Sequence, residues 1–247
     1  MRSRYPSSST FAYSFGPGPL TPAIKAIVAA NVAVFVVWYF QRAVEVPLWM
    51  NPQDVVHGQV WRLATYMFVH GGFFHILFNM LALWMFGVEL ERTWGSRYFV
   101  KYYFVCGVGA ALTTVLLSFL PGIFGQQLYL SRTVGASGAV MGVLLAYALY
   151  FPNRPIYMYF VFPIPAKYFV AIIGAISLLS SMGGGGGIAH STHLGGLLAG
   201  YLYLKGGRIH LLSEIKYRYL KWRINRMRRK FDVYSGGRAD DVNRRVH

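Results

Sequence analysis

The chain has 247 residues, of which 55% are hydrophobic and only 13% are charged, and its formal net charge at pH 7 is +16. Charged residues make up roughly 25% of an ordinary soluble domain, so this composition excludes that class and favours a membrane protein. A high positive charge also occurs in nucleic-acid-binding proteins, and the positions of the basic residues along the chain distinguish the two classes.

Long windows without charged residues predict membrane-spanning helices. A helix needs about 20 predominantly apolar residues to cross the hydrocarbon core of a bilayer. On this basis the sequence predicts six spans, which cover roughly residues 24–41, 74–91, 99–120, 136–152, 158–181 and 189–205. Pro163, Pro165 and Lys167 interrupt the beginning of the fifth span. The predicted fold class is therefore an all-α membrane protein, a bundle of six transmembrane helices.

The predicted spans divide the chain into three parts. A short tail, residues 1–23, precedes a membrane domain of residues 24–205, and a basic tail of residues 206–247 follows it. Within the second tail, residues 211–231 combine apolar residues at helical spacing with many cations, which predicts an amphipathic helix on a membrane surface. Five consecutive glycines at 183–187 suit either a mobile lid or a plain flexible connector between the last two spans.

The basic residues collect on one side of the predicted topology. If the N-terminus lies inside, all but three of the 24 Lys and Arg residues fall on inner segments or inner span ends, the exceptions being Arg42, Arg62 and Arg132. The positive-inside rule then predicts that both termini are cytoplasmic. Because topology and the lipid bilayer account for the charge, no nucleic-acid partner is expected.

A serine stands among glycines where the fourth span begins. Ser137 lies between Gly135 and Gly138. Because this span runs from outside to inside, Ser137 falls in the first helical turn, where free N–H groups and the helix dipole favour a developing anion. The position indicates a nucleophile. The alternative is that Gly138 and Gly142 form a small-residue packing motif in which the serine only packs.

The sixth span offers a base for this serine. His193 lies near its outer end, and Gly196 and Gly200 follow on the same helical face. If these glycines face Gly138 and Gly142, the two backbones can approach closely enough for a Ser–His hydrogen bond. No Asp or Glu occurs between residues 92 and 213, so a dyad is predicted rather than a triad with a carboxylate. The alternative is a histidine that only bonds to a neighbouring helix.

The second span carries further polar residues near its outer end. His75 and Asn79 are four residues apart and share a helix face, where neutral donors could stabilise an oxyanion. Alternatively, a zinc site could use the histidines at 70, 75, 190 and 193. The sequence has no HExxH motif, no acidic ligand near these histidines and no thiolate cluster, so neither a metal nor another cofactor is expected.

Five stretches in chain order carry a resemblance to a known family: Trp61-Arg62, the segment HGGFFHILFN at 70–79, the pattern FG…ER…G at 86–95, GASG at 135–138, and HxxGxxxG at 193–200. Together they resemble the rhomboid family of intramembrane serine proteases, in its bacterial six-transmembrane type. The resemblance covers about residues 24–205. It implies a multi-pass protein of the bacterial inner membrane with a rhomboid-like helical bundle.

The resemblance also implies a division of roles. Ser137 would be the nucleophile and His193 the general base, and the oxyanion would be stabilised by Asn79, His75 and the Ser137 amide. Structural glycines near the site would be Gly135, Gly138, Gly196 and Gly200. In the family, water reaches the site through an outward-open cavity, and the fifth span with the loop after it controls substrate access. Members cleave transmembrane segments of other proteins at small residues near the outer face.

One position departs from the family pattern, and two other classes of function stay open. Met141 occupies a site where some bacterial members have an aromatic residue that packs on the catalytic histidine. An inactive relative that binds and guides membrane proteins would typically lack the serine or the histidine, and this chain has both. A transporter or channel would need charged or paired polar residues deep in several spans, or an inverted repeat, and neither is visible.

Overall fold

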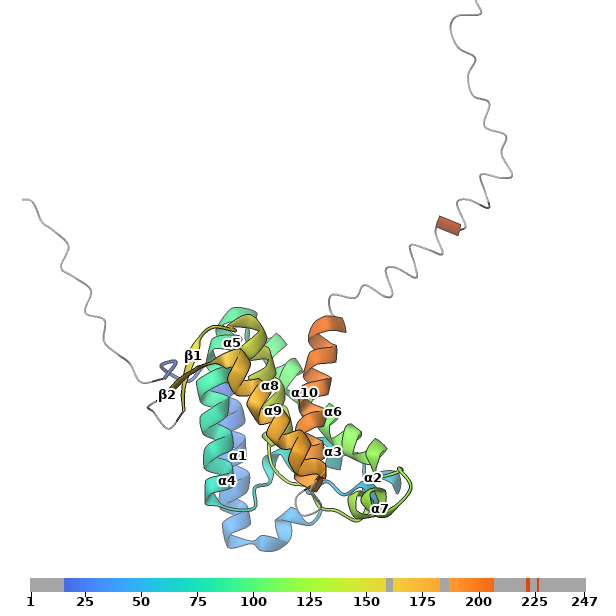
Figure 1. The fold of residues 1–247 in the computed structure, drawn as a ribbon. Helices are drawn as coiled ribbons and strands as arrows, with labels where there is room; N and C mark the ends of the chain where they lie inside the picture. Colours follow the sequence, from blue (N-terminus) through green and yellow to red (C-terminus); the bar gives the residue numbers. More distant parts are fainter. Residues whose placement is uncertain (1–15, 159–161, 183–186, 207–220, 223–225, 227–247) are drawn as a thin grey trace, which may run out of the picture. The chain divides into compact units, whose positions relative to one another are not determined.

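The computed structural model describes residues 16–158, 162–182, 187–206, 221–222 and 226. A helix lies at each of the six predicted spans, which confirms a helical membrane bundle (Figure 1). These helices are α1 (Pro22–Phe40), the continuous segment α4 (Phe73–Ala82), η3 (Leu83–Gly87) and α5 (Val88–Trp94), then α6 (Ser96–Leu117), α8 (Ser137–Tyr150), α9 (Ala166–Met182) and α10 (Gly187–Gly206). Most of both tails, including the predicted amphipathic helix, and the glycines at 183–186 lie outside the described residues.

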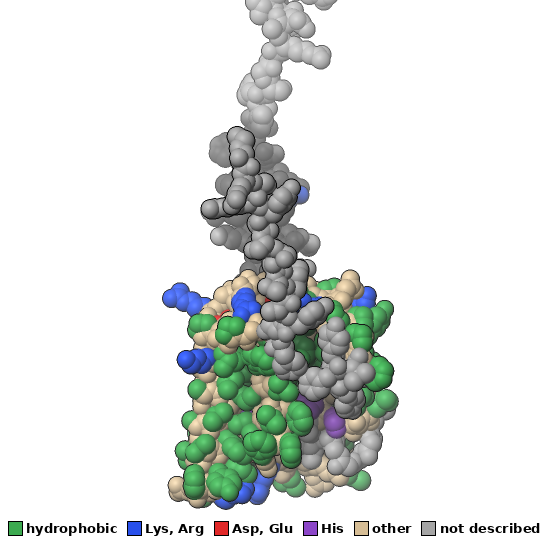
Figure 2. All heavy atoms as spheres, turned by 90° about the vertical axis from the view of Figure 1, so that its left-hand side faces the viewer, with side chains coloured by type: hydrophobic (Ala, Val, Ile, Leu, Met, Phe, Trp, Pro, Cys, Tyr) green, Lys and Arg blue, Asp and Glu red, His purple; other side chains and the backbone are tan. Residues whose placement is uncertain are grey.

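Three of these helical segments are long and apolar enough to cross a membrane by length and composition. They are Pro22–Phe40, Phe73–Trp94 and Ser96–Leu117, while Ser137–Tyr150 and Ala166–Ser180 are shorter apolar helices. Hydrophobic side chains cover the middle of the face shown in Figure 2, and Lys and Arg side chains lie toward its upper and lower rims. This distribution is what a bilayer-facing surface requires.

A buried carboxylate holds one end of the bundle together. Glu91, in the middle of α5, is 3% exposed and accepts hydrogen bonds from the amides of Ala23 (2.9 Å) and Ile24 (3.0 Å). It also accepts bonds from the hydroxyls of Ser96 (2.6 Å) and Thr21. The acid therefore satisfies free N–H groups at the start of α1 and ties α1 to the beginning of α6. We call this end of the bundle, which also carries Arg92, Arg97 and Lys101, the basic end.

The helix α8 forms the centre of the bundle. Every residue from Gly138 to Leu144 is buried, and a helix that is apolar on all sides belongs in a core. At 14 residues it is about 21 Å long, against about 30 Å for the hydrocarbon core. At least one end of α8 therefore lies below the membrane surface, inside the protein.

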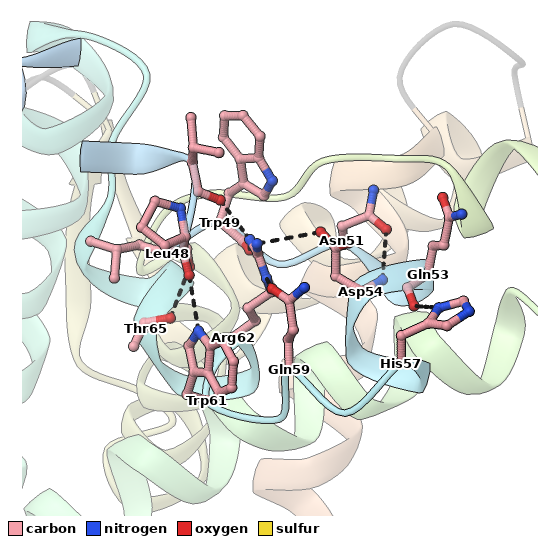
Figure 3. Close-up of polar contacts among 12 residues, drawn as sticks. Leu48, Trp49, Asn51, Gln53, Asp54, His57, Gln59, Trp61, Arg62 and Thr65 are labelled. Atoms are coloured by element: carbon pink, nitrogen blue, oxygen red, sulfur yellow. Dashed lines mark hydrogen bonds and ion pairs between the residues drawn. The ribbon is translucent and has the colours of Figure 1, made fainter. Parts of the chain in front are cut away.

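The loop between α1 and α4 is folded around one arginine. It contains η1 (Arg42–Glu45), α2 (Pro52–Val56), α3 (Arg62–Thr65) and η2 (Tyr66–Phe68). Arg62 is 5% exposed, and Figure 3 shows its guanidinium among the loop's polar groups. It donates to the carbonyls of Val46 and Trp49 (2.7 Å each) and to Gln59 Oε1 (2.7 Å), and it pairs with Asp54 at 3.5 Å. These bonds satisfy backbone carbonyls of a non-helical segment.

The chain before α9 differs from the predicted fifth span. The fifth span was predicted to be helical from residue 158, but two strands precede the helix. They are β1 (Pro155–Met158) and β2 (Phe162–Pro165), and Ile156 pairs with Ile164 between them. Pro163 and Pro165 have no N–H to donate and disfavour helix in the residue before them, so α9 begins only at Ala166. An ion pair between Arg154 and Glu89 (3.1 Å) joins the start of the hairpin to α5 at the basic end.

Candidate active site

The loop before α8 holds Ser137 at the beginning of that helix. Thr133 exchanges backbone hydrogen bonds with Met50 of the first loop (2.8 and 2.9 Å), and the Gly135 amide donates to the Tyr66 carbonyl (2.9 Å). Gly135 has φ +111°, a conformation that favours glycine. Ser137 is the first residue of α8, so the free N–H groups of the first helical turn surround it.

Ser137 and His193 meet across two helices. The Oγ atom of Ser137 lies 2.8 Å from Nε2 of His193 in α10, a distance typical of a hydrogen bond. The residues are 56 positions apart in the chain. A hydroxyl bonded to an imidazole nitrogen is the arrangement that nucleophilic acyl transfer needs, because the imidazole can take the hydroxyl proton.

Glycines allow this contact between α8 and α10. A Cβ atom built on Gly196 would lie 1.9 Å from the Gly138 carbonyl oxygen, and one on Gly200 would lie 3.2 Å from the Gly142 Cα. The two helices therefore touch backbone to backbone along the face that carries Ser137 and His193. A further bond, between the hydroxyls of Thr114 and Thr192 (2.9 Å), joins α6 to α10 one residue before His193.

The close approach of α8 and α10 leads to a specific prediction about Gly196. We expect Gly196→Ala to destabilise the bundle by at least about 1–3 kcal/mol, the usual cost of overpacking, because its Cβ meets backbone that cannot rotate away. Thermal unfolding in detergent measures this effect. Gly206→Ala is the matched control at the end of the same helix, since a Cβ there meets nothing within 4 Å. Equal melting temperatures for the two variants would contradict the packing at Gly196.

His75 lies beside the turn that precedes Ser137. A Cβ atom on Gly135 would be 2.6 Å from His75 Nε2, so the absence of a side chain at Gly135 leaves room for the imidazole. The Gly71 amide donates to His75 Nδ1 (3.4 Å), which places the ring proton on Nε2, the atom facing Gly135. His75 can therefore present an N–H donor next to the start of α8.

The structure places Asn79 one turn further along α4, and the side chain is 7% exposed. Its Nδ2 atom donates to the backbone carbonyl of His75 (2.8 Å), so one of its two N–H groups is used within its own helix. Met141, the departure from the family pattern, is buried in α8 one turn after Ser137 and is 6% exposed.

Two loop residues contribute to the site in ways that the sequence did not reveal. His70, which begins the 70–79 motif and was weighed above as a zinc ligand, is 1% exposed and accepts the Ala136 N–H through Nε2 (3.4 Å). Burial, and then the neighbouring His75, lower the pKa of His70 to about 4, so it is neutral near pH 7. Tyr66 is fully buried, and its hydroxyl donates to the Gly107 carbonyl (2.8 Å) in α6. No local pattern marks a tyrosine as a support of this kind.

Four of the chain's seven histidines, at positions 70, 75, 190 and 193, lie in two pairs. The rings of His70 and His75 are 5.0 Å apart, and those of His190 and His193 are 5.8 Å apart. Across the described part of the chain, no three His, Cys, Asp or Glu residues are grouped as ligands of a metal ion.

The fold and this site define a helical membrane protein with a Ser–His pair held inside the bundle. Comparison with known proteins places it more closely, because the family model described as "Rhomboid domain" matches residues 57–207. The chain belongs to the rhomboid family, as the sequence motifs predicted.

Relatives from fungi and bacteria agree with this assignment. The chain is 30% identical over 185 residues to "Rhomboid protein 1, mitochondrial" of Saccharomyces cerevisiae, covering 73% of this chain and 51% of that protein. It is 31% identical over 156 residues to "Rhomboid protease GluP" of Bacillus subtilis, covering 60% and 26% of the two proteins. It is also 31% identical over 161 residues to "Rhomboid protease AarA" of Providencia stuartii, covering 59% and 55%. The chain spans about half the length, or less, of these curated relatives.

Proposed function

We propose that this chain is an intramembrane serine endopeptidase that cleaves transmembrane segments of other proteins through Ser137 and His193. The observation that carries the proposal is the 2.8 Å contact between Ser137 Oγ and His193 Nε2 at the start of a buried helix. Two relatives that are named rhomboid proteases support peptidase chemistry. We assign this activity to the membrane domain of residues 24–205, which precedes the basic tail of residues 206–247.

The proposed reaction is acyl transfer to the serine. Ser137 Oγ attacks the carbonyl carbon of the scissile peptide bond while His193 Nε2 takes the hydroxyl proton. The C–N bond then breaks, the amine leaves with the proton held by His193, and a water molecule hydrolyses the acyl-enzyme by the same proton route. No carboxylate lies between residues 92 and 213 in the sequence, so His193 acts as a base without an acidic partner on α8 or α10.

Stabilisation of the oxyanion is assigned to the Ser137 amide, His75 and Asn79. Among the described residues the Ser137 N–H has no acceptor at the first position of α8, and the helix dipole favours negative charge there. Nε2 of His75 carries a proton and faces Gly135, directly before this turn. Asn79 has one N–H group beyond the one that bonds to the His75 carbonyl, so we propose it as the weaker donor.

This ranking of the two donors is testable. We expect His75→Ala to lower kcat by roughly 10²–10³-fold, the usual cost of losing one oxyanion donor, and Asn79→Ala to lower it less without abolishing it. Steady-state cleavage of a single-span substrate in liposomes measures both. Unfolding temperatures near that of the wild type serve as the control for folding. A complete loss in a folded Asn79→Ala protein would contradict the ranking.

The substrates proposed are single-span or other transmembrane proteins that reach the site from the bilayer. We place both termini on the side of the membrane that holds the basic end, as the positive-inside rule indicates, which in a bacterial inner membrane is the cytoplasm. The relatives' names include mitochondrial as well as bacterial proteins, so the bacterial inner membrane rests on the sequence motifs alone.

The proposal as a whole is tested with the wild-type protein. Purified protein in liposomes is incubated with a single-span protein substrate and, separately, with a fluorophosphonate that labels activated serines. We expect a new N-terminus within or beside the substrate's transmembrane segment and a covalent label on Ser137, both identified by mass spectrometry. Folded protein that neither cleaves nor takes up the label would instead be the non-catalytic, binding type of relative.

A further inference from the structure

Small residues hold α6 and α10 in contact through the half of the bundle near the active site. A Cβ on Gly109 of α6 would lie 2.4 Å from the Ala199 Cβ of α10, and one on Gly195 would lie 2.7 Å from the Thr113 Cβ. The Thr114–Thr192 hydrogen bond lies in the same region. Backbones can approach this closely only where side chains are small.

A groove runs along the outer side of the same two helices toward the basic end. Phe104 and Val108 of α6 and Leu202 and Tyr203 of α10 line it, and its volume is about 580 Å³. Its lining is apolar except at one point, Lys101. Leu202 is 58% exposed, so the groove opens on the outer surface of the bundle.

The length of the groove matches one leaflet of a membrane. On α6 its lining residues lie on one helix face at spacings of three and four, from Lys101 to Leu112. At about 1.5 Å per residue, this face is about 16 Å long. Half of a hydrocarbon core of about 30 Å is about 15 Å. An acyl chain extending from the basic end to the middle of the bilayer would therefore lie along the whole groove.

A cation stands where the headgroup of such a lipid would lie. Lys101 is exposed near the start of α6, and its Nζ lies 5.8 Å from the Tyr203 ring centroid. Lys101 forms no ion pair with any residue that the structure describes. An unpaired ammonium at the mouth of an apolar groove is complementary to a phosphate joined to an acyl chain.

We propose that the groove between α6 and α10 binds one anionic glycerophospholipid from the leaflet at the basic end. Its acyl chain fills the space beside Phe104 and Val108, and its phosphate contacts Lys101. The lipid thereby contacts both α6 and α10 along the outer side of their interface. This role is separate from the proposed peptidase chemistry and does not depend on it.

Comparison with a second groove shows why we place the lipid phosphate at Lys101. It has a volume of about 480 Å³, lies between α9 and α10 over α8, and also has a lysine in its lining, Lys167. The Nζ of Lys167 already donates to Asn153 Oδ1 (3.1 Å), which occupies part of its hydrogen-bonding capacity. Its lining on α9 extends only from Lys167 to Gly174, about 10 Å at the helical rise.

The test measures binding and stability rather than proteolysis. Delipidated full-length protein in a neutral detergent is titrated with phosphatidylglycerol, with phosphatidylcholine of the same chains, and with glycerol phosphate, while thermal unfolding and native mass spectrometry are followed. We expect saturable binding of one phosphatidylglycerol, a higher melting temperature with this lipid than with phosphatidylcholine, and no response to glycerol phosphate. Equal responses to the two lipids, or a response to glycerol phosphate alone, would overturn the proposal.

Variants of the chain test whether the lipid binds in this groove. Lys101→Gln should weaken phosphatidylglycerol binding roughly five- to tenfold, the value of one lysine near an anionic headgroup. Lys25→Gln removes an exposed lysine of α1 near the basic end, outside either groove, and should bind like the wild type. Leu202→Trp, at an exposed position where extra volume is tolerated, should fill the groove and abolish the binding. If Lys101→Gln and Lys25→Gln weaken binding equally, the lipid is attracted by the general positive charge of the surface, which overturns the proposal. Dimers cross-linked through position 202 would identify a second copy of the chain as the occupant of the groove and would also overturn it.

Discussion

Ser137→Ala is expected to insert and fold like the wild type but to lose proteolysis by on the order of 10³-fold or more. The change removes one oxygen atom whose hydrogen bond in the structure is the 2.8 Å contact with His193, so little packing is lost. Removing the nucleophile abolishes the covalent step, and the loss in serine proteases is correspondingly large. Cleavage of a single-span substrate in liposomes, with melting temperature as the control for folding, measures the effect.

A matched serine distinguishes a catalytic loss from a general one. Ser131 lies six residues earlier, and its hydroxyl bonds locally, to the Leu128 carbonyl at 2.7 Å. Ser131→Ala should therefore keep most of the activity and the fluorophosphonate label, whereas Ser137→Ala should lose both. If folded Ser137→Ala protein cleaves at close to the wild-type rate, the serine mechanism is wrong.

The second large effect is expected at one of two neighbouring histidines on α10, His193 and His190. His193→Ala should abolish cleavage, because the Ser137 hydroxyl loses the only imidazole within hydrogen-bonding distance among the described residues. His190→Ala should retain a substantial fraction, since its ring contacts His193 edge-on with centroids 5.8 Å apart. The variants are compared in the same liposome assay at equal protein content.

Fluorophosphonate labelling tests the same assignment without a protein substrate. The label reports whether the Ser137 hydroxyl is activated, and activation requires a base in contact with it. We expect Ser137 to be labelled in His190→Ala and to stay unlabelled in His193→Ala. The reverse pattern would assign the base to His190 and would contradict the geometry of the pair.

Much of the fold and the Ser137–His193 pair could be predicted from the sequence because both depend on local signals. Hydropathy over about 20 residues identifies a membrane helix without knowledge of its neighbours, and all six predicted spans contain one. Ser137 and His193 stand beside glycines at helical spacing, a pattern that is also read locally. The start of the fifth span was predicted too early because the two prolines suit the strand β2, and that strand forms only when β1 pairs with it.

The sequence by itself determined the membrane class, the six helices and the pairing of Ser137 with His193. Only the tertiary structure decided that His70 bonds to the Ala136 amide, that Tyr66 joins the first loop to α6, and that a groove opens beside Lys101. Each of these features joins segments from different parts of the chain. Such contacts depend on how whole helices pack, because side-chain size along an interface sets where two backbones touch and where they separate.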